Sequence, residues 1–383
     1  MTLYWPVQWV HTHSFTSSLY WTVRSWLWNH PITSDYAVWD QGDPNEWEEW
    51  NKERARILCI WKFLEPYFAE RGYTLYVQKN LTDVFALQYP ASKMIETRHL
   101  VSYPYAQYHC KNEADLGFFP DVGDNDIIKP EAEDSTQSPR VWPARDKDGR
   151  DVMIKAISGA VPTNELKALQ LLHSEPLCND PRNRTIPVIE FIEFNQQTFV
   201  VMPRWCVAIE CDFVTVGEII GYARAIFEAV AFLHENNIAH GDLLAQNMCM
   251  DVILPKPRDN HDYYTGLHGP ERKYVLIDFE TAQIHRGSGP CSPEFERSRK
   301  RDIYFLAWSL LPNLRCIENV IPPIVDLLDS MMENDSYVAA SAALSRFEKI
   351  CASLTEADLN LPVAAYLWSD GHLQYREGSP ANQ

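Results

Sequence analysis

The chain has 383 residues, 46% of them hydrophobic, which is enough for two or three domains or for one large two-lobed domain. Its 34 basic and 52 acidic side chains give a net charge of −18. This charge disfavours nucleic acid and anionic membranes as partners, because both are bound through basic surfaces. No run of about 20 apolar residues occurs, so we expect no membrane span.

The nine cysteines are scattered along the chain, without a CxxC pair or a Cys/His spacing typical of metal sites. An odd, unpatterned set of cysteines indicates reduced thiols. The first residues also lack the basic start and clean apolar run of a secretory signal. These features together predict an intracellular, cytoplasmic protein.

Residues 1–128 are predicted to form an N-terminal extension. Its start is rich in tryptophan, with Trp5, Trp9, Trp21, Trp26 and Trp28. These side chains are expected either to pack on the main domain or to lie in a poorly ordered segment, and an interfacial anchor is a weaker alternative. Apolar side chains at helical spacing predict an amphipathic helix over 44–70. A strand is expected over 73–78, and an acidic linker rich in Pro, Asp and Ser over 111–140.

From about residue 129 the pattern changes to strands. Residues 141–145 and 150–155 flank an Asp-Gly turn, which predicts a hairpin. A short helix capped by Thr163 or Asn164 follows, and then strands are expected over 186–191 and 198–202. These elements predict a small antiparallel lobe over 129–205.

A capping box at Thr215 and Glu218 then opens a long apolar helix. It begins a larger helical lobe over 206–355, which a C-terminal tail over 356–383 follows. The fold class is therefore α+β.

Two segments carry the chemistry. Residues 238–247 place Asp242 and Asn247 five positions apart, and residues 274–280 form an apolar strand that ends on Asp278. Transfer of phosphate from ATP needs a carboxylate to orient the attacking hydroxyl, and an amide plus a second carboxylate to hold magnesium. We therefore predict Asp242 as the base, and Asn247 and Asp278 as ligands of Mg²⁺, which prefers oxygen donors.

Both segments resemble the protein-kinase superfamily, and more closely the divergent kinase-like proteins of mushroom-forming (basidiomycete) fungi. The resemblance covers roughly residues 130–355, and the amino-acid sequences of 184–191 and 199–205 are similar to those of the fungal group. It implies a two-lobed kinase-like fold that uses ATP and magnesium, and a protein kinase of Ser/Thr rather than Tyr type.

The same resemblance assigns roles to further residues. Lys155 would bind the nucleotide phosphates and also act in catalysis, with Glu165 as its helix partner. Met202 would contact the nucleotide near the connection between the lobes. His240 would support the catalytic loop, and Asp302 would tie that loop to a helix.

The chain departs from the kinase pattern where phosphate is bound. Aligning Val141 with the valine after the glycine-rich loop puts Asp134, Thr136 and Pro139 in place of the three glycines. Those glycines let backbone N–H groups approach phosphate, whereas proline has no N–H to offer. We therefore expect a poor phosphate cradle at 134–139.

Other departures concern the acceptor side. Gly241 stands where kinases have an arginine that pairs with a phosphorylated activation loop. Leu244 stands where Ser/Thr kinases have a lysine near the transferred phosphate, and Glu280 replaces the glycine after Asp-Phe. Residues 278–294, which resemble an activation segment, are short for binding a peptide. Glu280 fits equally a second acid at the metal or a salt-bridging surface residue.

Two alternative functions stay open. The short segment and Glu280 are also typical of small-molecule kinases that resemble aminoglycoside and choline phosphotransferases, so the acceptor is either a protein or a small hydroxyl compound. The missing glycines and Leu244 favour a catalytically degenerate pseudokinase that acts as a binding scaffold. Assays with Mg-ATP and both acceptor classes distinguish these functions.

Overall fold

A computed structural model describes most of the chain. The described residues are 8–10, 15–30, 32–40, 47–78, 87–88, 102–108, 139–253, 264–287, 289–333, 338–363, 366–369 and 372–375. The expectations for Trp5, Asp134, Thr136 and the acidic linker up to position 138 lie outside these residues.

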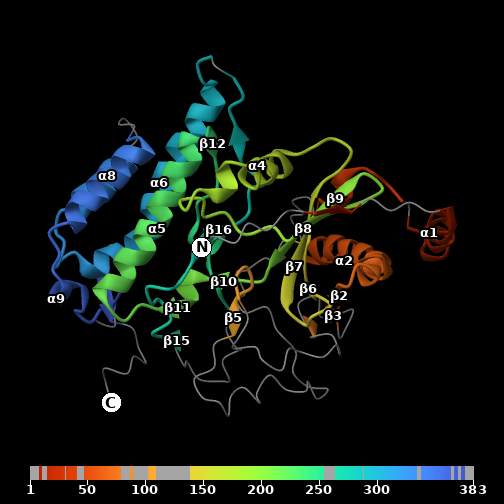
Figure 1. Ribbon diagram of the computed structural model, residues 1–383, viewed down its shortest axis with the longest axis horizontal. Helices are drawn as coiled ribbons and strands as arrows, with labels where there is room; N and C mark the ends of the chain where they lie inside the picture. Colours follow the sequence, from red (N-terminus) through yellow and green to blue (C-terminus); the bar gives the residue numbers. More distant parts are fainter. Residues whose placement is uncertain are drawn as a thin grey trace, which may run out of the picture.

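The protein has two lobes of different composition, a small lobe built on a sheet and a large helical lobe (Figure 1). The α+β, two-lobed architecture predicted from the sequence is thus confirmed. The sheet has the strand order β1-β8-β9-β7-β6-β2. Its strands are β1 (Gln8–Val10), β2 (Thr74–Leu75), β6 (Val141–Arg145), β7 (Asp151–Ser158), β8 (Glu190–Phe194) and β9 (Gln197–Pro203).

The strands predicted over 129–205 pair antiparallel, as expected. The edge strand β1, which lies outside that range, adds parallel to β8, and one strand boundary differs from the expectation. Strand β8 begins at Glu190 instead of residue 186, because the chain before it is bound to the large lobe. There the Ile186 N–H donates to the Leu276 carbonyl at 3.1 Å, and Thr185 forms a bridge to the same residue.

The predicted hairpin of β6 and β7 is present, and its turn explains the register. One carboxylate oxygen of Asp146 accepts hydrogen bonds from the backbone N–H groups of Asp148 and Arg150, each at 2.9 Å. Gly149 has φ +77°, a conformation that costs glycine little. The register places Lys155 in the middle of β7, opposite Val141 on β6 and Val200 on β9.

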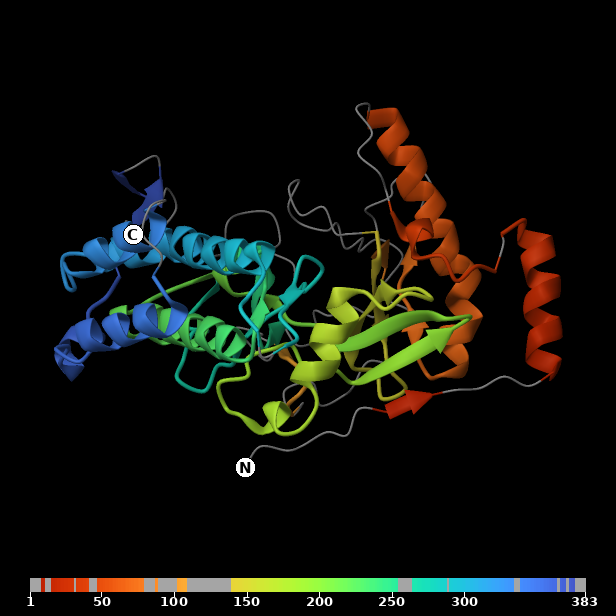
Figure 2. The same ribbon diagram turned by 90° about the horizontal axis from the view of Figure 1, so that it is seen from above.

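Helices cover both faces of the sheet, because alternate strand residues on both sides are apolar. Helix α4 (Asn164–Leu172) lies on the face toward the large lobe, and Thr163 caps it. The predicted amphipathic helix is α2 (Trp47–Glu70), which packs on the other face (Figure 2). The side chains of Trp61 and Phe68 are fully buried there.

Helix α1 (Phe15–Trp28) lies beyond α2 (Figure 2). Only part of its aromatic surface is packed. Trp21 is 5% exposed and meets Phe194 with ring centroids 4.9 Å apart, whereas Trp26 is 80% exposed. The expected strand over 73–78 is split into β2, which pairs with β6, and β3 (Val77–Gln78), which pairs with β4 (Leu87–Gln88).

The large lobe is built on helices, a three-stranded sheet of order β10-β13-β16 and short strand pairs. Its helices are α5 (Val216–Glu235), α6 (Pro293–Leu314), α7 (Ile324–Met332), α8 (Ala340–Cys351) and α9 (Glu356–Leu359). Its strands are β10 (Cys206–Val207), β11 (Cys211–Asp212), β12 (Ile238–Ala239), β13 (Met248–Met250), β14 (Val252–Ile253), β15 (Tyr264–Thr265), β16 (Tyr274–Leu276) and β17 (Gln283–Ile284); β5 (Gln107–Tyr108) pairs with β14, and β18 (Tyr366–Ser369) pairs with β19 (His372–Tyr375).

Short 3-10 helices complete the described structure: η1 (Tyr36–Trp39), η3 (Leu177–Asn179), η4 (Ala208–Glu210), η5 (Ala245–Asn247) and η6 (Arg315–Ile317). None of the helices that the structure describes has the length and apolar character needed to cross a membrane.

Thr215 caps α5 as predicted, since its hydroxyl accepts from the Glu218 N–H. The capping box does not close as expected. The Glu218 carboxylate accepts from the N–H of Val214 at 2.6 Å, one residue before the cap. The backbone around the cap is extended, because the C-terminal segment pairs with it: the Val216 N–H donates to the Leu361 carbonyl.

Candidate functional site

Three charged side chains from separate segments meet where the two lobes join. The Lys155 ammonium lies 2.7 Å from a carboxylate oxygen of Glu165 and 2.7 Å from one of Asp278. Lys155 and Glu165 are buried, while the Asp278 side chain is 37% exposed. The sequence therefore predicted residues that the fold brings into direct contact.

Local structure explains why Glu165 reaches Lys155 although only ten positions separate them. Strand β7 ends at Ser158, and α4 begins a few residues later. The Thr163 hydroxyl accepts from the Leu166 N–H at 3.2 Å and donates to the Ile157 carbonyl at 2.6 Å, which ties the helix start to the strand. Glu165 thus lies in the first turn of α4, close to the middle of β7.

The charges of this cluster are coupled. Burial alone lowers the pKa of the Lys155 ammonium, but the carboxylates of Glu165 and Asp278 raise it above its ordinary value. Burial raises the pKa of Glu165 to about 7, against the opposing effect of Lys155. Burial also acts to raise the pKa of Asp278, but the Lys155 charge holds it below its ordinary value. Lys155 is therefore a fixed cation, and Asp278 is an anion near neutral pH.

Asp278 has an uncommon backbone conformation, with φ +63°. Such a left-handed conformation costs a non-glycine residue free energy, and it persists where the surrounding structure imposes it. Here the preceding N–H of Ile277 donates to the Asn247 carbonyl at 3.0 Å, and the following Phe279 is buried against the His240 ring. The strand end is thus held from both sides.

The loop over 240–247 is fixed by its own side chains. Asn247 donates from its amide nitrogen to the carboxylate and to the carbonyl of Asp242, at 2.9 Å each. The His240 Nδ1 accepts from the Asp242 N–H at 3.3 Å, so its Nε2 carries the proton and donates to the Ile277 carbonyl at 2.9 Å. Burial lowers the pKa of His240 and keeps it neutral, in agreement with a supporting role.

Helix α6 anchors this loop at two points. The Asp302 carboxylate is fully buried and accepts from the backbone N–H groups of His240 and Gly241, at 2.8 and 2.7 Å. Ser309, seven residues later on the same helix face, donates to the Leu243 carbonyl at 2.8 Å. Asp302 was predicted from the sequence and Ser309 was not, although the helical spacing of Ser309 from Asp302 was an available signal.

The geometry supplies a reason for Gly241 that the motif comparison did not. Gly241 has φ +83°, and a Cβ atom there would lie 2.7 Å from the backbone oxygen and from the hydroxyl of Thr281. Thr281 itself donates to the His240 carbonyl at 3.0 Å. Any larger residue at 241, an arginine included, would have to displace this contact.

We expect Gly241→Ala to lower the free energy of unfolding by about 1–3 kcal/mol, because it combines an unfavourable φ with a contact to backbone. Urea denaturation measures this change. Gly221→Ala is the matched control. Gly221 lies inside α5 with nothing within 4 Å of its added Cβ, so that variant should gain up to about 1 kcal/mol. Equal stability of the two variants would contradict the loop conformation described above.

The oxygen donors of Asn247 and Asp278 fit a hard divalent cation. The amide nitrogen of Asn247 is engaged with Asp242, which leaves its amide oxygen as the atom suited to a metal. No group of three or more His, Cys, Asp and Glu side chains with metal-binding geometry occurs among the described residues. Mg²⁺ often takes only one or two protein ligands and completes its shell with phosphate and water.

Met202 and Leu244, two residues that the sequence singled out, have apolar or partly buried surroundings. Met202 is half-buried near the end of β9, opposite Met153, and packs against core residues of both lobes. Leu244 is half-buried just before η5. Neither side chain brings charge to the cluster around Lys155.

Two further carboxylates are linked to the edge of this cluster by Arg140, a residue that was not predicted from the sequence. The Arg140 guanidinium forms ion pairs with Glu280 and with Asp40. Glu280 follows Asp278 by two positions, so the pair connects the start of the small lobe to the segment that carries Asp278. In this structure Glu280 is thus a salt-bridging residue.

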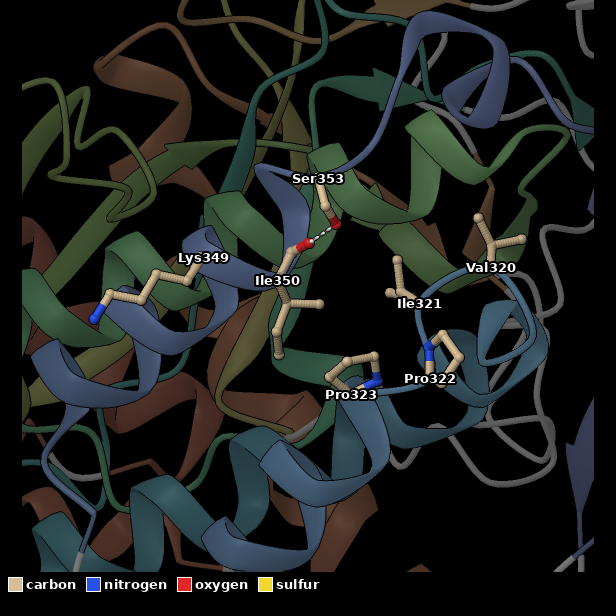
Figure 3. A pocket seen from close by; sticks show the side chains of 7 residues that line it. All are labelled: Val320, Ile321, Pro322, Pro323, Lys349, Ile350 and Ser353. Atoms are coloured by element: carbon tan, nitrogen blue, oxygen red, sulfur yellow. Dashed lines mark hydrogen bonds between the residues drawn. The ribbon is translucent and has the colours of Figure 1, made fainter.

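A separate surface pocket of about 310 Å³ lies in the large lobe (Figure 3). Its lining is mostly apolar and consists of Val320, Ile321, Pro322, Pro323, Lys349, Ile350 and Ser353. The Ser353 hydroxyl is directed back to the Ile350 carbonyl at 3.0 Å. With no carboxylate or imidazole in its lining, this pocket does not fit magnesium and a polyphosphate, so the candidate site is the cluster around Lys155.

No family model matches the chain, and no curated protein matches it. Among solved structures, it is similar to the crystal structure of the Rad53 kinase domain and SCD2. That match has 16% sequence identity and a TM-score of 0.39, and it covers 58% of this chain and 92% of the other. The resemblance to the fungal kinase-like group stays a prediction from sequence.

Proposed function

We propose that the protein is a magnesium- and ATP-dependent phosphotransferase that transfers the terminal phosphate to a hydroxyl group. The observation that carries the proposal is the contact of Lys155 with both Glu165 and Asp278, at 2.7 Å each. A buried lysine held by two carboxylates, beside a loop that presents another carboxylate and an amide, has the charge pattern of such a site.

Each residue has a distinct role in this proposal. Asp242 accepts the proton of the attacking hydroxyl, and the Asn247 amide holds its carboxylate in place. Lys155 binds the phosphates that are not transferred, and Glu165 orients it. Asn247 and Asp278 would hold magnesium, which when bound neutralises phosphate charge. His240 and Asp302 position the loop, and Met202 lines the nucleotide base.

One observation favours a small hydroxyl compound over a protein as the acceptor. Helix α6 begins at Pro293 and continues without interruption through Asp302 to Leu314, and Ser292 caps it. Residues 293–294, which resemble the end of an activation segment, therefore form the first turn of this helix. Only residues 279–292 connect Asp278 to α6, which leaves little chain on which a peptide could be aligned.

The test is phosphate transfer from labelled Mg-ATP by the purified full chain. Separate reactions contain a generic protein rich in Ser and Thr, and a panel of small alcohols that includes amino alcohols and aminoglycosides. Transfer to either class supports the enzyme and names its acceptor. Binding of Mg-ATP without transfer to any acceptor would instead support the alternative of a pseudokinase scaffold. The absence of both binding and transfer would refute the proposal.

A further inference from the structure

The phosphate end of the candidate site needs a positive group other than Lys155, because the segment before Val141 lacks the glycines of a phosphate-binding loop. In that segment Pro139 and Arg140 are described by the structure. Their backbone is fixed: the Trp61 indole donates to the Pro139 carbonyl at 2.8 Å, and the Ala156 N–H donates to the Arg140 carbonyl at 2.9 Å. The Arg140 side chain thus starts from a rigid point beside β7.

The Arg140 guanidinium is held between the N-terminal segment and the segment of Asp278. It donates to the Trp39 carbonyl and to the Tyr36 hydroxyl, at 3.3 Å each, and forms ion pairs with Asp40 and Glu280. Its side chain is 14% exposed, whereas those of Asp40 and Glu280 are 52% and 44% exposed. The guanidinium is therefore half-buried, and the two carboxylates are more exposed and face solvent.

The Tyr36 phenol shows how close this group is to Lys155. Its hydroxyl donates to the Ala156 carbonyl at 3.2 Å, on the residue next to Lys155. Burial raises its pKa to about 12, and the charges that act on it come from Arg140, Glu165, Lys155 and Glu280. The Tyr36 phenol thus contacts Arg140 directly and the residue next to Lys155 through its backbone.

We propose that Arg140 binds the phosphates of the nucleotide and takes the place of the missing glycine-rich loop. The inference rests on the proposed phosphotransferase function. In the structure the Glu280 carboxylate forms an ion pair with the guanidinium, at the position that a phosphate oxygen would take. A planar guanidinium suits phosphate oxygens as well as carboxylates. Solvent-exposed ion pairs are weak, so an incoming polyphosphate can replace Glu280 at little cost.

The test compares the binding of Mg-ATP and of adenosine by calorimetry on the full chain. Arg140→Gln should weaken Mg-ATP binding about 10- to 100-fold, the effect of one or two charge-assisted hydrogen bonds. Adenosine has no phosphate, so its affinity should change less than about twofold. Arg140→Lys, which keeps the charge without the planar fork, should give an intermediate affinity for Mg-ATP.

Two matched variants separate phosphate binding from a purely structural bridge. Glu280→Gln and Asp40→Asn each break one ion pair of Arg140 but keep the cation. If Arg140 binds phosphate, both variants bind Mg-ATP as tightly as the wild type or more tightly. If the ion pairs of Arg140 only hold the lobe together, Arg140→Gln, Glu280→Gln and Asp40→Asn should all lose affinity for Mg-ATP and for adenosine alike. This result would overturn the inference.

The wild type distinguishes failure of this inference from failure of the proposed function. A wild-type chain that binds no Mg-ATP refutes both. Wild-type binding that Arg140→Gln leaves unchanged refutes only the role of Arg140. Near-ultraviolet circular dichroism of each variant checks its tertiary structure, and if Arg140→Gln does not fold, the comparison of Arg140→Lys with the two carboxylate variants decides the question.

Discussion

Phosphate transfer by Asp242→Asn is expected to be about 10²- to 10⁴-fold slower than by the wild type, because an amide cannot accept the hydroxyl proton. Mg-ATP affinity and the melting temperature should stay close to wild-type values. The Asn247 amide also donates to the Asp242 carbonyl at 2.9 Å, and this bond is kept in the variant. The measurements are initial transfer rates with whichever acceptor the proposed transfer assay identifies, and calorimetry with Mg-ATP.

The matched control is Asp326→Asn, which changes an exposed acid on α7 in the same way. It should transfer phosphate at the wild-type rate. Asp242 is misassigned as the base if its Asn variant keeps full activity. A variant that loses nucleotide binding along with transfer would instead indicate that Asp242 acts on the nucleotide or its metal.

The second large effect concerns the buried ion pairs. Lys155→Met removes the only partner cation that contacts Glu165 in the described structure, and leaves a buried carboxylate uncompensated. Breaking one side of a buried pair costs about 3–5 kcal/mol of folding free energy. The same change removes the phosphate contact, so Mg-ATP binding should be lost. Urea denaturation and calorimetry measure the two effects.

A double variant separates the two consequences. Lys155→Met with Glu165→Leu replaces the pair by apolar side chains, and it should recover most of the lost stability. It should still bind Mg-ATP far more weakly than the wild type, because no cation takes the position of Lys155 next to Asp278. Wild-type affinity in the double variant would show that the nucleotide binds elsewhere, and an unchanged stability of Lys155→Met would contradict the burial of the pair.

The sequence predicted those parts of the fold that depend on local chemistry. The Asp146 turn and Gly149 specify the β6–β7 hairpin, and apolar spacing specifies α2, because both signals lie within a few neighbouring residues. The spacing of Asp242 and Asn247 likewise reflects a hydrogen bond within one loop. Their functional roles stay predictions.

Long-range contacts account for what the sequence did not indicate. Strand β8 starts late because residues 185–186 bind Leu276 of the other lobe, and no local pattern encodes that partner. From the sequence, Gly241 was interpreted as the replacement of an arginine. In the structure its closest surroundings are the backbone and side chain of Thr281, forty positions away. Arg140 gave no signal, since its partners Asp40 and Glu280 are about 100 and 140 positions distant.

The burial of the outer sheet face by α2 has a consequence for how the chain can be divided. Ile154, Phe199 and Val201 on that face are fully buried against a layer that includes Trp61. Gly159 fits just as closely under the N-terminal segment, since an added Cβ would lie 2.5 Å from the Ser34 carbonyl. A fragment with the kinase-like motifs alone, from residue 129 onward, would expose this apolar surface to water and be prone to self-association. The described residues between 21 and 76 therefore cover the outer face of the small lobe, and we expect the smallest fragment that folds to carry both.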